Sequence, residues 1–396
     1  MEEVGFKSNA HLEAKANTSI PGDHPPRSLP ERLDGLTALR AIAASAVVLL
    51  HFHVTTFRSL GLGRYIPFVS HYYLGVDLFF ILSGFILAHV HGRDFARLTP
   101  SNTAQFYILR LARIYPAHVT VLMMYVCLFL LLKFSPYDGI GLRAPADHYT
   151  ASALIAHLLL VSPGVTSWNS PAWSVSAEWS AYLWFPLLAF ALRRASPRFC
   201  VIALVGIVGG FADIYFQYFN STMDHLGLLR VSFEFPAGYL IYRASYRTSL
   251  SRVISVLAPV VGLGLLLLAT DFAEFGFVLL IGAIVAITGH RSTVRRHWHV
   301  PHLLIWLGEI SYSVYIIHAL VMATAGRAAE GLLPRLSLPL QLALVPVLFM
   351  VVVVCAAMLH RIVEKPARDW MRTGLFQSAR AVRDRFRAMA LYTRSL

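Results

Sequence analysis

The sequence predicts an all-α integral membrane protein with about ten transmembrane helices and both termini in the cytoplasm. Hydrophobic residues make up 57% of the 396-residue chain and charged residues only 14%, whereas soluble domains carry about 25% charged residues to cover their surface. Apolar runs recur from about residue 36 to about residue 361, with no long hydrophilic insert between them. Lipid must therefore replace the missing polar surface.

Ten runs have the length and composition expected of membrane helices. They cover residues 36–55, 72–91, 106–132, 172–192, 200–219, 229–242, 253–270, 273–289, 303–324 and 339–361. The sixth run is the least typical, because it is short and contains Glu234. A further apolar patch near residues 154–161 is too short to span the bilayer and is interpreted as a helix at the interface.

These runs divide the chain into one membrane domain, residues 34–365, between two tails. Residues 1–33 are polar and rich in proline, without the apolar core of a cleavable signal, and we expect them to form a flexible cytoplasmic tail. Residues 366–396 are basic, and apolar residues recur at every third or fourth position from Phe376 to Met389. This pattern predicts an amphipathic helix on the anionic inner leaflet. A helix that binds a partner protein is the alternative.

Basic residues set the predicted orientation. Most of the 34 Lys and Arg residues fall on the two tails and on alternate loops, and few fall on the opposite loops. The positive-inside rule then places both termini in the cytoplasm. The membrane is expected to be the inner (plasma) membrane. The net charge of +13 does not indicate nucleic-acid binding, because the basic residues are spread between apolar runs rather than clustered on a soluble face.

Polar side chains from several helices are predicted at one depth, in the outer half of the membrane. Any one of them could simply bridge two helices by a hydrogen bond. Titratable groups in lipid are costly, however, and normally mark a site or a pathway, so the agreement in depth favours a functional site. The titratable members are His51, Asp77, Glu178 and His318, and the polar neighbours of Glu178 are Trp173, Ser174 and Ser176.

Arginines near the inner interface form a second group of candidates. Arg110 and Arg113 are three residues apart at the start of a helix, so their guanidinium groups share a face and could hold phosphate oxygens. Arg40 precedes His51 by eleven residues, which is about 16 Å along a helix and nearly the same face. An anionic ligand on the cytoplasmic side fits this arrangement.

No metal site is predicted. All three cysteines lie inside apolar runs, which supports neither a disulfide framework nor a thiolate site. His297, His299 and His302 stand in a basic loop with no acidic or cysteine partner, and a solvated charge cluster explains them better than a metal centre does.

Six motifs, in order along the chain, resemble the membrane-bound acyltransferase-3 family over nearly the whole membrane domain. One departure is that many members have the first arginine soon after an LDGL opening, where Thr37 stands here, although the Arg-to-His spacing is kept. The motifs are Arg40-x10-His51, GVDLFFILSGFIL from Gly75, Arg110-x2-Arg113 followed by IYP, SPAWSVSAEWSAYLWFP from Ser170, GEISYSVYIIH ending at His318, and RIVEKPAR around Glu364.

The resemblance implies transfer of an acyl group, commonly acetyl, from acyl-CoA to a hydroxyl of an envelope glycan or a small molecule. His51 would be the general base, since an imidazole titrates near neutral pH, and Asp77 or Glu178 would fix its tautomer. Arg40, Arg110 and Arg113 would hold the coenzyme A phosphates. Residues that would assist the acceptor or the oxyanion are Trp173, Ser174, Ser176 and His318.

Other features of the reaction stay open. The acceptor can be a polysaccharide, a lipid-linked sugar or a small hydroxylated metabolite. A secondary transporter that uses His, Asp and Glu as a proton relay is the alternative function. Against it, the sequence shows neither an internal repeat nor a pair of Gly/Pro-broken helices in matching halves.

Overall fold

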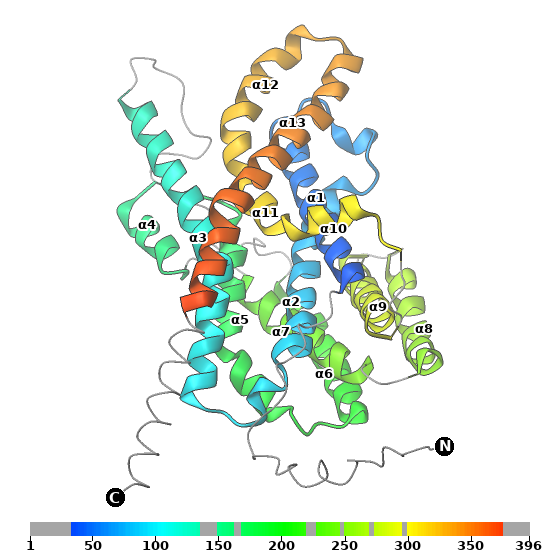
Figure 1. The fold of residues 1–396 in the computed structure, drawn as a ribbon. Coiled ribbons are helices and arrows are strands. Elements are labelled where there is room, and N and C mark those ends of the chain that lie inside the picture. The colour runs from blue at the N-terminus through cyan, green and yellow to red at the C-terminus, as the bar shows by residue number, and fades with distance from the viewer. Residues whose placement is uncertain are drawn as a thin grey trace, which may run out of the picture. The chain divides into compact units, whose positions relative to one another are not determined.

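The computed structural model describes residues 33–134, 149–161, 168–218, 227–245, 249–268, 273–294 and 299–374. Within these residues the protein contains helices and no strand, which confirms the expected all-α class for this part (Figure 1). Residues 1–32 and 375–396, which hold nearly all of the first predicted tail and the predicted amphipathic helix of the second, lie outside the described residues.

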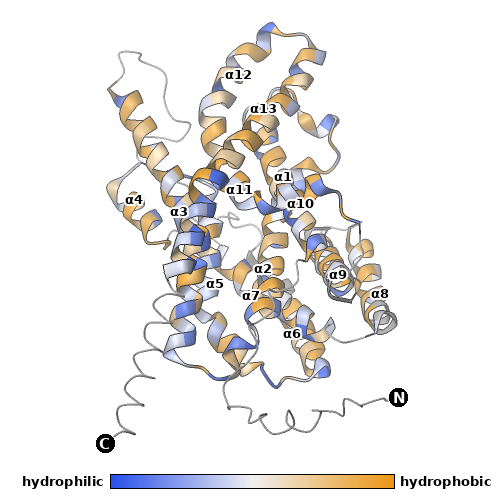
Figure 2. Cartoon of the chain, viewed as in Figure 1, coloured by the Kyte–Doolittle hydropathy of each residue, from blue (hydrophilic) through white to orange (hydrophobic). Residues whose placement is uncertain are grey.

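Among the described residues, five helices are long and apolar enough to cross a membrane: Asp34–Val54, Val69–His91, Pro100–Lys133, Ser311–Arg335 and Leu338–Gly374. Figure 2 shows hydrophobic colouring along the upper parts of the third and the last of these, whose lower parts carry hydrophilic residues. These helices make the chain a membrane protein. The full number of about ten spans and the cytoplasmic position of both termini stay predictions.

Most helices coincide with the predicted runs. A short helix, α4 (Ala151–Leu158), also forms where an interface helix was expected; its N-cap Thr150 accepts a hydrogen bond from the Ala153 backbone N–H at 3.1 Å. The helices that match single runs are α1 (Asp34–Val54), α2 (Gly75–His91), α3 (Pro100–Lys133), α5 (Ala172–Ala191), α6 (Pro197–Tyr218), α7 (Gly227–Ser245), α8 (Leu250–Leu267), α9 (Ala273–Val294) and α13 (Leu338–Leu359).

The ninth run was predicted as one helix over residues 303–324, and this prediction was wrong. The chain forms α10 (His302–Glu309) and then α11 (Ser311–Val321), because Ile310 between them leaves helical geometry with φ −89° and ψ 2°. Gly308 presses against α1, where a Cβ atom would lie 2.0 Å from the Thr37 carbonyl oxygen. The break lets α10 pack on the start of α1 while α11 enters the interior.

The sixth run, the least typical in sequence, becomes the enclosed helix α7. It packs against α2, α5, α6 and α9, and 13 of its 19 residues are buried. Its polar residues Arg230 and Glu234 therefore face protein rather than lipid. A helix surrounded by other helices needs no continuous apolar face, which explains its weak membrane signal.

Helices α2 and α7 cross at backbone contact (Figure 1). A Cβ atom on Gly84 would lie 1.9 Å from the Phe235 carbonyl oxygen, and one on Gly238 would lie 2.0 Å from that of Ile81. Two glycines facing each other allow this approach, as small residues do at membrane helix interfaces. The crossing fixes how α2 presents its side chains to the interior.

The last long helix contains a π-helical turn, η8 (His360–Glu364), directly after α13. Such turns insert one extra residue into a helix and are frequent at functional sites. Here the turn contacts α3 and leaves Glu364 fully buried. The chain continues as a helix to Gly374.

Gly238→Ala is expected to lower stability, because the added methyl group has no room against α2. Overpacking of this kind costs about 1–3 kcal/mol, measured as a lower midpoint of thermal unfolding of the detergent-purified protein. Gly206→Ala is the matched control, since nothing lies within 4 Å of its Cβ position. Equal midpoints for the two variants would contradict the close crossing.

Candidate active site

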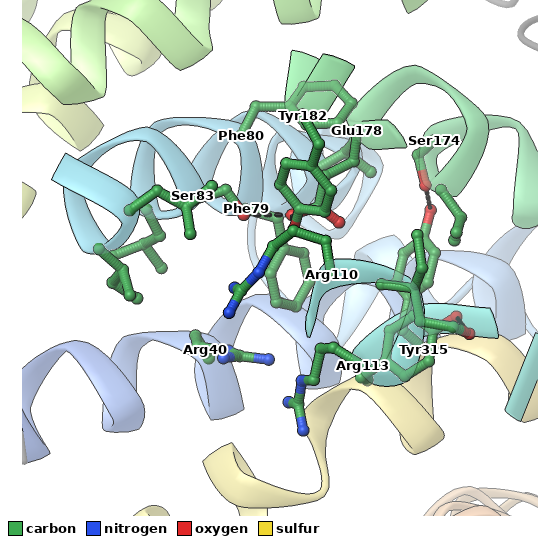
Figure 3. Close-up of a pocket in the computed structure, with 17 residues that line it drawn as sticks. Arg40, Phe79, Phe80, Ser83, Arg110, Arg113, Ser174, Glu178, Tyr182 and Tyr315 are labelled. Atoms are coloured by element: carbon green, nitrogen blue, oxygen red, sulfur yellow. Dashed lines mark hydrogen bonds between the residues drawn. The ribbon is translucent and has the colours of Figure 1, made fainter. Parts of the chain in front are cut away.

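Three arginines gather in one internal pocket, a cavity of about 100 Å³ bounded by α1, α2, α3, α5 and α11. Arg40 comes from α1, whereas Arg110 and Arg113 come from one face of α3, as their spacing predicted. Figure 3 shows the three guanidinium groups pointing toward one another. The structure thus brings the three arginines to one cavity, and their role in holding a ligand stays a prediction.

Each arginine of the pocket has different neighbours. Arg113 forms an ion pair with the fully buried Glu364. Arg110 lies 3.2 Å from Nε2 of His91 and has its guanidinium carbon 5.7 Å from the Phe106 ring centroid. Arg40 has no hydrogen bond or ion pair within the part of the chain that the structure describes. Three like charges in a confined space attract an anion.

Hydroxyl groups and one carboxylate complete the pocket. Glu178 accepts hydrogen bonds from Ser83 and from the Tyr182 hydroxyl, the latter at 2.6 Å. The Ser174 and Tyr315 hydroxyls are 2.6 Å apart, on a different side of the cavity from the arginines (Figure 3). Both hydroxyls also donate toward the Pro171 carbonyl oxygen, at 3.1 Å and 3.2 Å. The pocket therefore has a cationic end and an end lined by two hydroxyls.

His51 and His318 meet edge to face, with ring centroids 4.8 Å apart. His51 donates from Nδ1 to the Val47 carbonyl oxygen at 2.8 Å, and His318 donates from Nδ1 to that of Tyr315 at 2.6 Å. A carbonyl only accepts, so both imidazoles are held as the tautomer whose Nε2 carries the lone pair. In the described residues, Nε2 of the fully buried His318 has no hydrogen-bond partner.

Tyr315 connects the histidine pair to the arginine pocket. Its side chain lines the cavity, its carbonyl oxygen orients His318, and its ring centroid lies 5.8 Å from that of His318. The two groups of residues that the sequence assigned to different depths are thus joined through one residue of α11. A ligand held at the arginines could extend toward a lone-pair nitrogen.

Asp77 belongs to a separate buried cluster. Both of its carboxylate oxygens accept hydrogen bonds from Arg230 of α7, from Nε to Oδ1 at 3.2 Å and from Nη2 to Oδ2. Glu234, also buried, lies 3.9 Å from the same Nε atom. The Arg230 guanidinium stands 5.8 Å above the Trp173 ring, which places Trp173 beside this cluster as well. These contacts join α2, α5 and α7.

The four titratable residues that the sequence placed at one depth have different partners in the structure. His51 and His318 meet, Glu178 lies in the arginine pocket, and Asp77 lies on Arg230. A carboxylate was expected to accept the Nδ1 proton of His51, but the Val47 carbonyl already does so. The catalytic roles of Asp77 and Glu178 stay predictions, as does the role of Ser176, which is buried on α5.

Several site residues escaped the sequence interpretation. Arg230 and Glu234 are one helical turn apart in an otherwise apolar run, a spacing typical of an ion pair. His91 and Asp94 are three residues apart at the end of α2 and bond through Nδ1 and Oδ2 at 2.9 Å. Either spacing predicts a local pair, but nothing in the sequence indicates which distant helix each pair contacts.

No metal centre is evident in the part of the chain that the structure describes. These residues contain no group of three or more His, Cys, Asp and Glu side chains placed to bind an ion.

The chain is similar in sequence to known acyltransferases. A family model described as an acyltransferase domain matches residues 33–360. Acyltransferase MdmB of Streptomyces mycarofaciens is 27% identical over 86% of this chain and 92% of its own length. O-acetyltransferase OatA of Staphylococcus aureus strain NCTC 8325 is 25% identical over 73% of this chain, and the match spans half of OatA.

A third relative, named protein 2 in the picA locus of Rhizobium radiobacter, is 33% identical over 39% of this chain and 78% of its own length. No solved structure matches the chain. The family match thus covers every residue that lines the arginine pocket and both residues of the histidine pair. Glu364, the partner of Arg113, lies just beyond the matched range.

Arg230→Ala is expected to destabilise the protein strongly, because it leaves two buried carboxylates without their counter-ion. Breaking a buried ion pair from one side costs about 3–5 kcal/mol, measured as the midpoint of thermal unfolding. Adding Asp77→Asn to Arg230→Ala should recover part of this loss. Arg198→Ala, at an exposed position of α6, serves as the control. Equal stability of Arg230→Ala and Arg198→Ala would rule out a structural role for the cluster.

Proposed function

The chain belongs to the acyltransferase-3 family, and we propose that it is a membrane O-acyltransferase that moves an acyl group, acetyl in the simplest case, from acyl-CoA to an acceptor hydroxyl. The observation that carries this proposal is the pocket whose cationic end is joined through Tyr315 to a pair of imidazoles. The donor has matching parts: phosphates at one end and a thioester at the end of a long arm. The name of OatA, an O-acetyltransferase, supports the choice of acetyl and of an oxygen acceptor.

The arginine end is proposed to hold the donor phosphates. Guanidinium groups bind phosphate oxygens through paired, charge-assisted hydrogen bonds. Arg40 and His51 are eleven residues apart on α1, about 16 Å along the helix. This length suits an extended pantetheine arm that reaches from the arginines toward the histidines.

His51 is proposed as the general base. Its Nε2 lone pair takes the proton of the acceptor hydroxyl while the hydroxyl oxygen attacks the thioester carbonyl carbon. The carbon–sulfur bond then breaks, the protonated imidazole returns the proton to the sulfur, and the products are an ester and free coenzyme A. His318 can accept a hydrogen bond at Nε2 from the protonated His51 or from the acceptor.

The developing oxyanion requires hydrogen-bond donors. The Ser174 and Tyr315 hydroxyls are the candidates, because both line the cavity. To act, a hydroxyl would turn its proton from the Pro171 carbonyl oxygen toward the oxyanion. Ser176 and Trp173 are proposed to contact the acceptor from the same helix. No metal takes part in this proposal.

In the membrane, the donor and the acceptor are proposed to reach the site from opposite sides. We propose that the protein lies in the inner (plasma) membrane with both termini in the cytoplasm, as the distribution of basic residues predicts. The donor then enters from the cytoplasm, and the acceptor, a glycan, a lipid-linked sugar or a small hydroxylated molecule, enters from the outer half. The proposed products leave on the sides from which their precursors came.

His51→Ala should abolish acyl transfer while the protein still inserts in the membrane, because the substitution removes the base and leaves the apolar helix intact. Acyl transfer to the acceptor by membrane vesicles is the measurement, and the amount of folded protein is checked by size-exclusion chromatography. His53→Ala, two residues further along the same helix, is the control and should keep transfer. Full activity in purified His51→Ala would refute the base assignment.

The donor assignment is tested by thiol release. Detergent-purified protein should release free coenzyme A from acetyl-CoA faster when a suitable acceptor glycan is present. Acceptors are found by comparing acylated envelope glycans of a deletion strain with those of its parent by mass spectrometry. Movement of a solute across proteoliposome membranes without thiol release would instead indicate the transporter.

A further inference from the structure

The three pocket arginines differ in whether their charge is already balanced. Resting on the proposed donor, we infer that Arg40 and Arg110 bind its phosphates, that Arg113 is held mainly by the protein, and that His91 is a positioning residue that orients Arg110 without neutralising it. The inference follows from the chemical nature of each arginine's partner, taken one at a time.

Arg113 has a carboxylate against its guanidinium group. Glu364 is fully buried on the π-helical turn, and its other oxygen accepts hydrogen bonds from Ser313 at 2.7 Å and from His360 at 3.0 Å. A carboxylate fixed from three sides cannot leave when a ligand arrives. Arg368 also lies 3.9 Å from Glu364, but the contact of Arg113 with this carboxylate is the shorter one. A phosphate that approached Arg113 would therefore meet a negative charge behind it.

Arg110 has a neutral partner instead. Its guanidinium group donates to Nε2 of His91 at 3.2 Å, so this nitrogen carries the lone pair and the imidazole is uncharged. The tautomer is set from the other side, where Nδ1 of His91 donates to Asp94 at 2.9 Å. His91 is itself buried and packs against the Phe106 ring, with centroids 5.3 Å apart.

The consequence for Arg110 is fixed geometry without an ion pair. A hydrogen bond to a neutral acceptor removes one donor of the guanidinium group and leaves the others, including an Nε–H that has no hydrogen-bond partner among the described residues. Arg40, likewise without an ion pair in those residues, stands across the same cavity. Glu178, the carboxylate that lines this cavity, accepts hydrogen bonds from Ser83 and Tyr182 and forms no ion pair with either arginine. Arg40 and Arg110 are therefore the pocket arginines whose donors are open to a phosphate.

The test compares H91Q with H91E, whose new side chains have equal length, and uses H91A to measure the loss of the imidazole. The amide introduced by H91Q would still offer Arg110 a neutral oxygen acceptor, whereas the carboxylate introduced by H91E would compete with phosphate for the same charge. We therefore expect H91A to weaken binding of coenzyme A, H91Q to recover most of the lost affinity, and H91E to weaken binding about tenfold or more. Isothermal titration calorimetry with coenzyme A and detergent-purified full-length protein is the measurement.

Turnover of acetyl-CoA adds an independent readout. H91E should raise the donor KM while kcat changes little, because the substitution acts on phosphate binding rather than on the acyl-transfer step. In the binding assay, Arg40→Ala and Arg110→Ala should each weaken coenzyme A binding more than the double variant R113A/E364Q, which removes the balanced pair together.

The outcomes separate this inference from the proposed function. If the wild-type protein does not bind coenzyme A, both the proposed donor and this inference are wrong. If it binds coenzyme A but H91Q and H91E bind it equally well, or R113A/E364Q weakens binding as much as Arg110→Ala does, only this inference is wrong.

Discussion

The backbone contact between α2 and α7 is the constraint on which the interior depends. Two glycines bring the helix axes together, and the pair of Asp77 with Arg230 joins the same two helices. A charge buried among apolar helices is tolerated only with its counter-ion close by, so this pair fixes the rotation of each helix. With that rotation set, α2 turns Ser83 toward Glu178 and lines one wall of the arginine pocket.

The interior contains arginines with a carboxylate partner and arginines without one. Around Arg230 two carboxylates accompany one cation, and Glu364 contacts Arg113 and lies 3.9 Å from Arg368. Within the residues that the structure describes, Arg40 and Arg110 form no ion pair, although Glu178 lines the same pocket. Structural ion pairs and a ligand site can therefore be built from the same residue types within one bundle, and the difference lies in whether a carboxylate accompanies the arginine.

The sequence alone predicted where most helices lie, but not which side chains of different helices contact each other. Apolar length located nearly every helix, because a membrane span needs a continuous run of apolar residues. It missed the break at Ile310, since both halves around it are apolar and Gly308 beside it approaches a residue far along the chain, Thr37. Depth reasoning placed His51, Asp77, Glu178 and His318 in one layer of the membrane. It could not resolve rotation about each helix axis, so it did not show that His51 meets His318 while Asp77 meets Arg230.

The arginine end of the pocket would recognise only the part of the proposed donor that the reaction leaves unchanged. Acyl-CoA and free coenzyme A carry identical phosphates, so the same guanidinium groups would hold substrate and product alike. Binding energy shared equally by both does not favour the transition state. The enzyme would then respond to the ratio of acylated to free coenzyme A in the cytoplasm rather than to the amount of the donor alone, and envelope modification would follow the acylation state of the cellular coenzyme A pool.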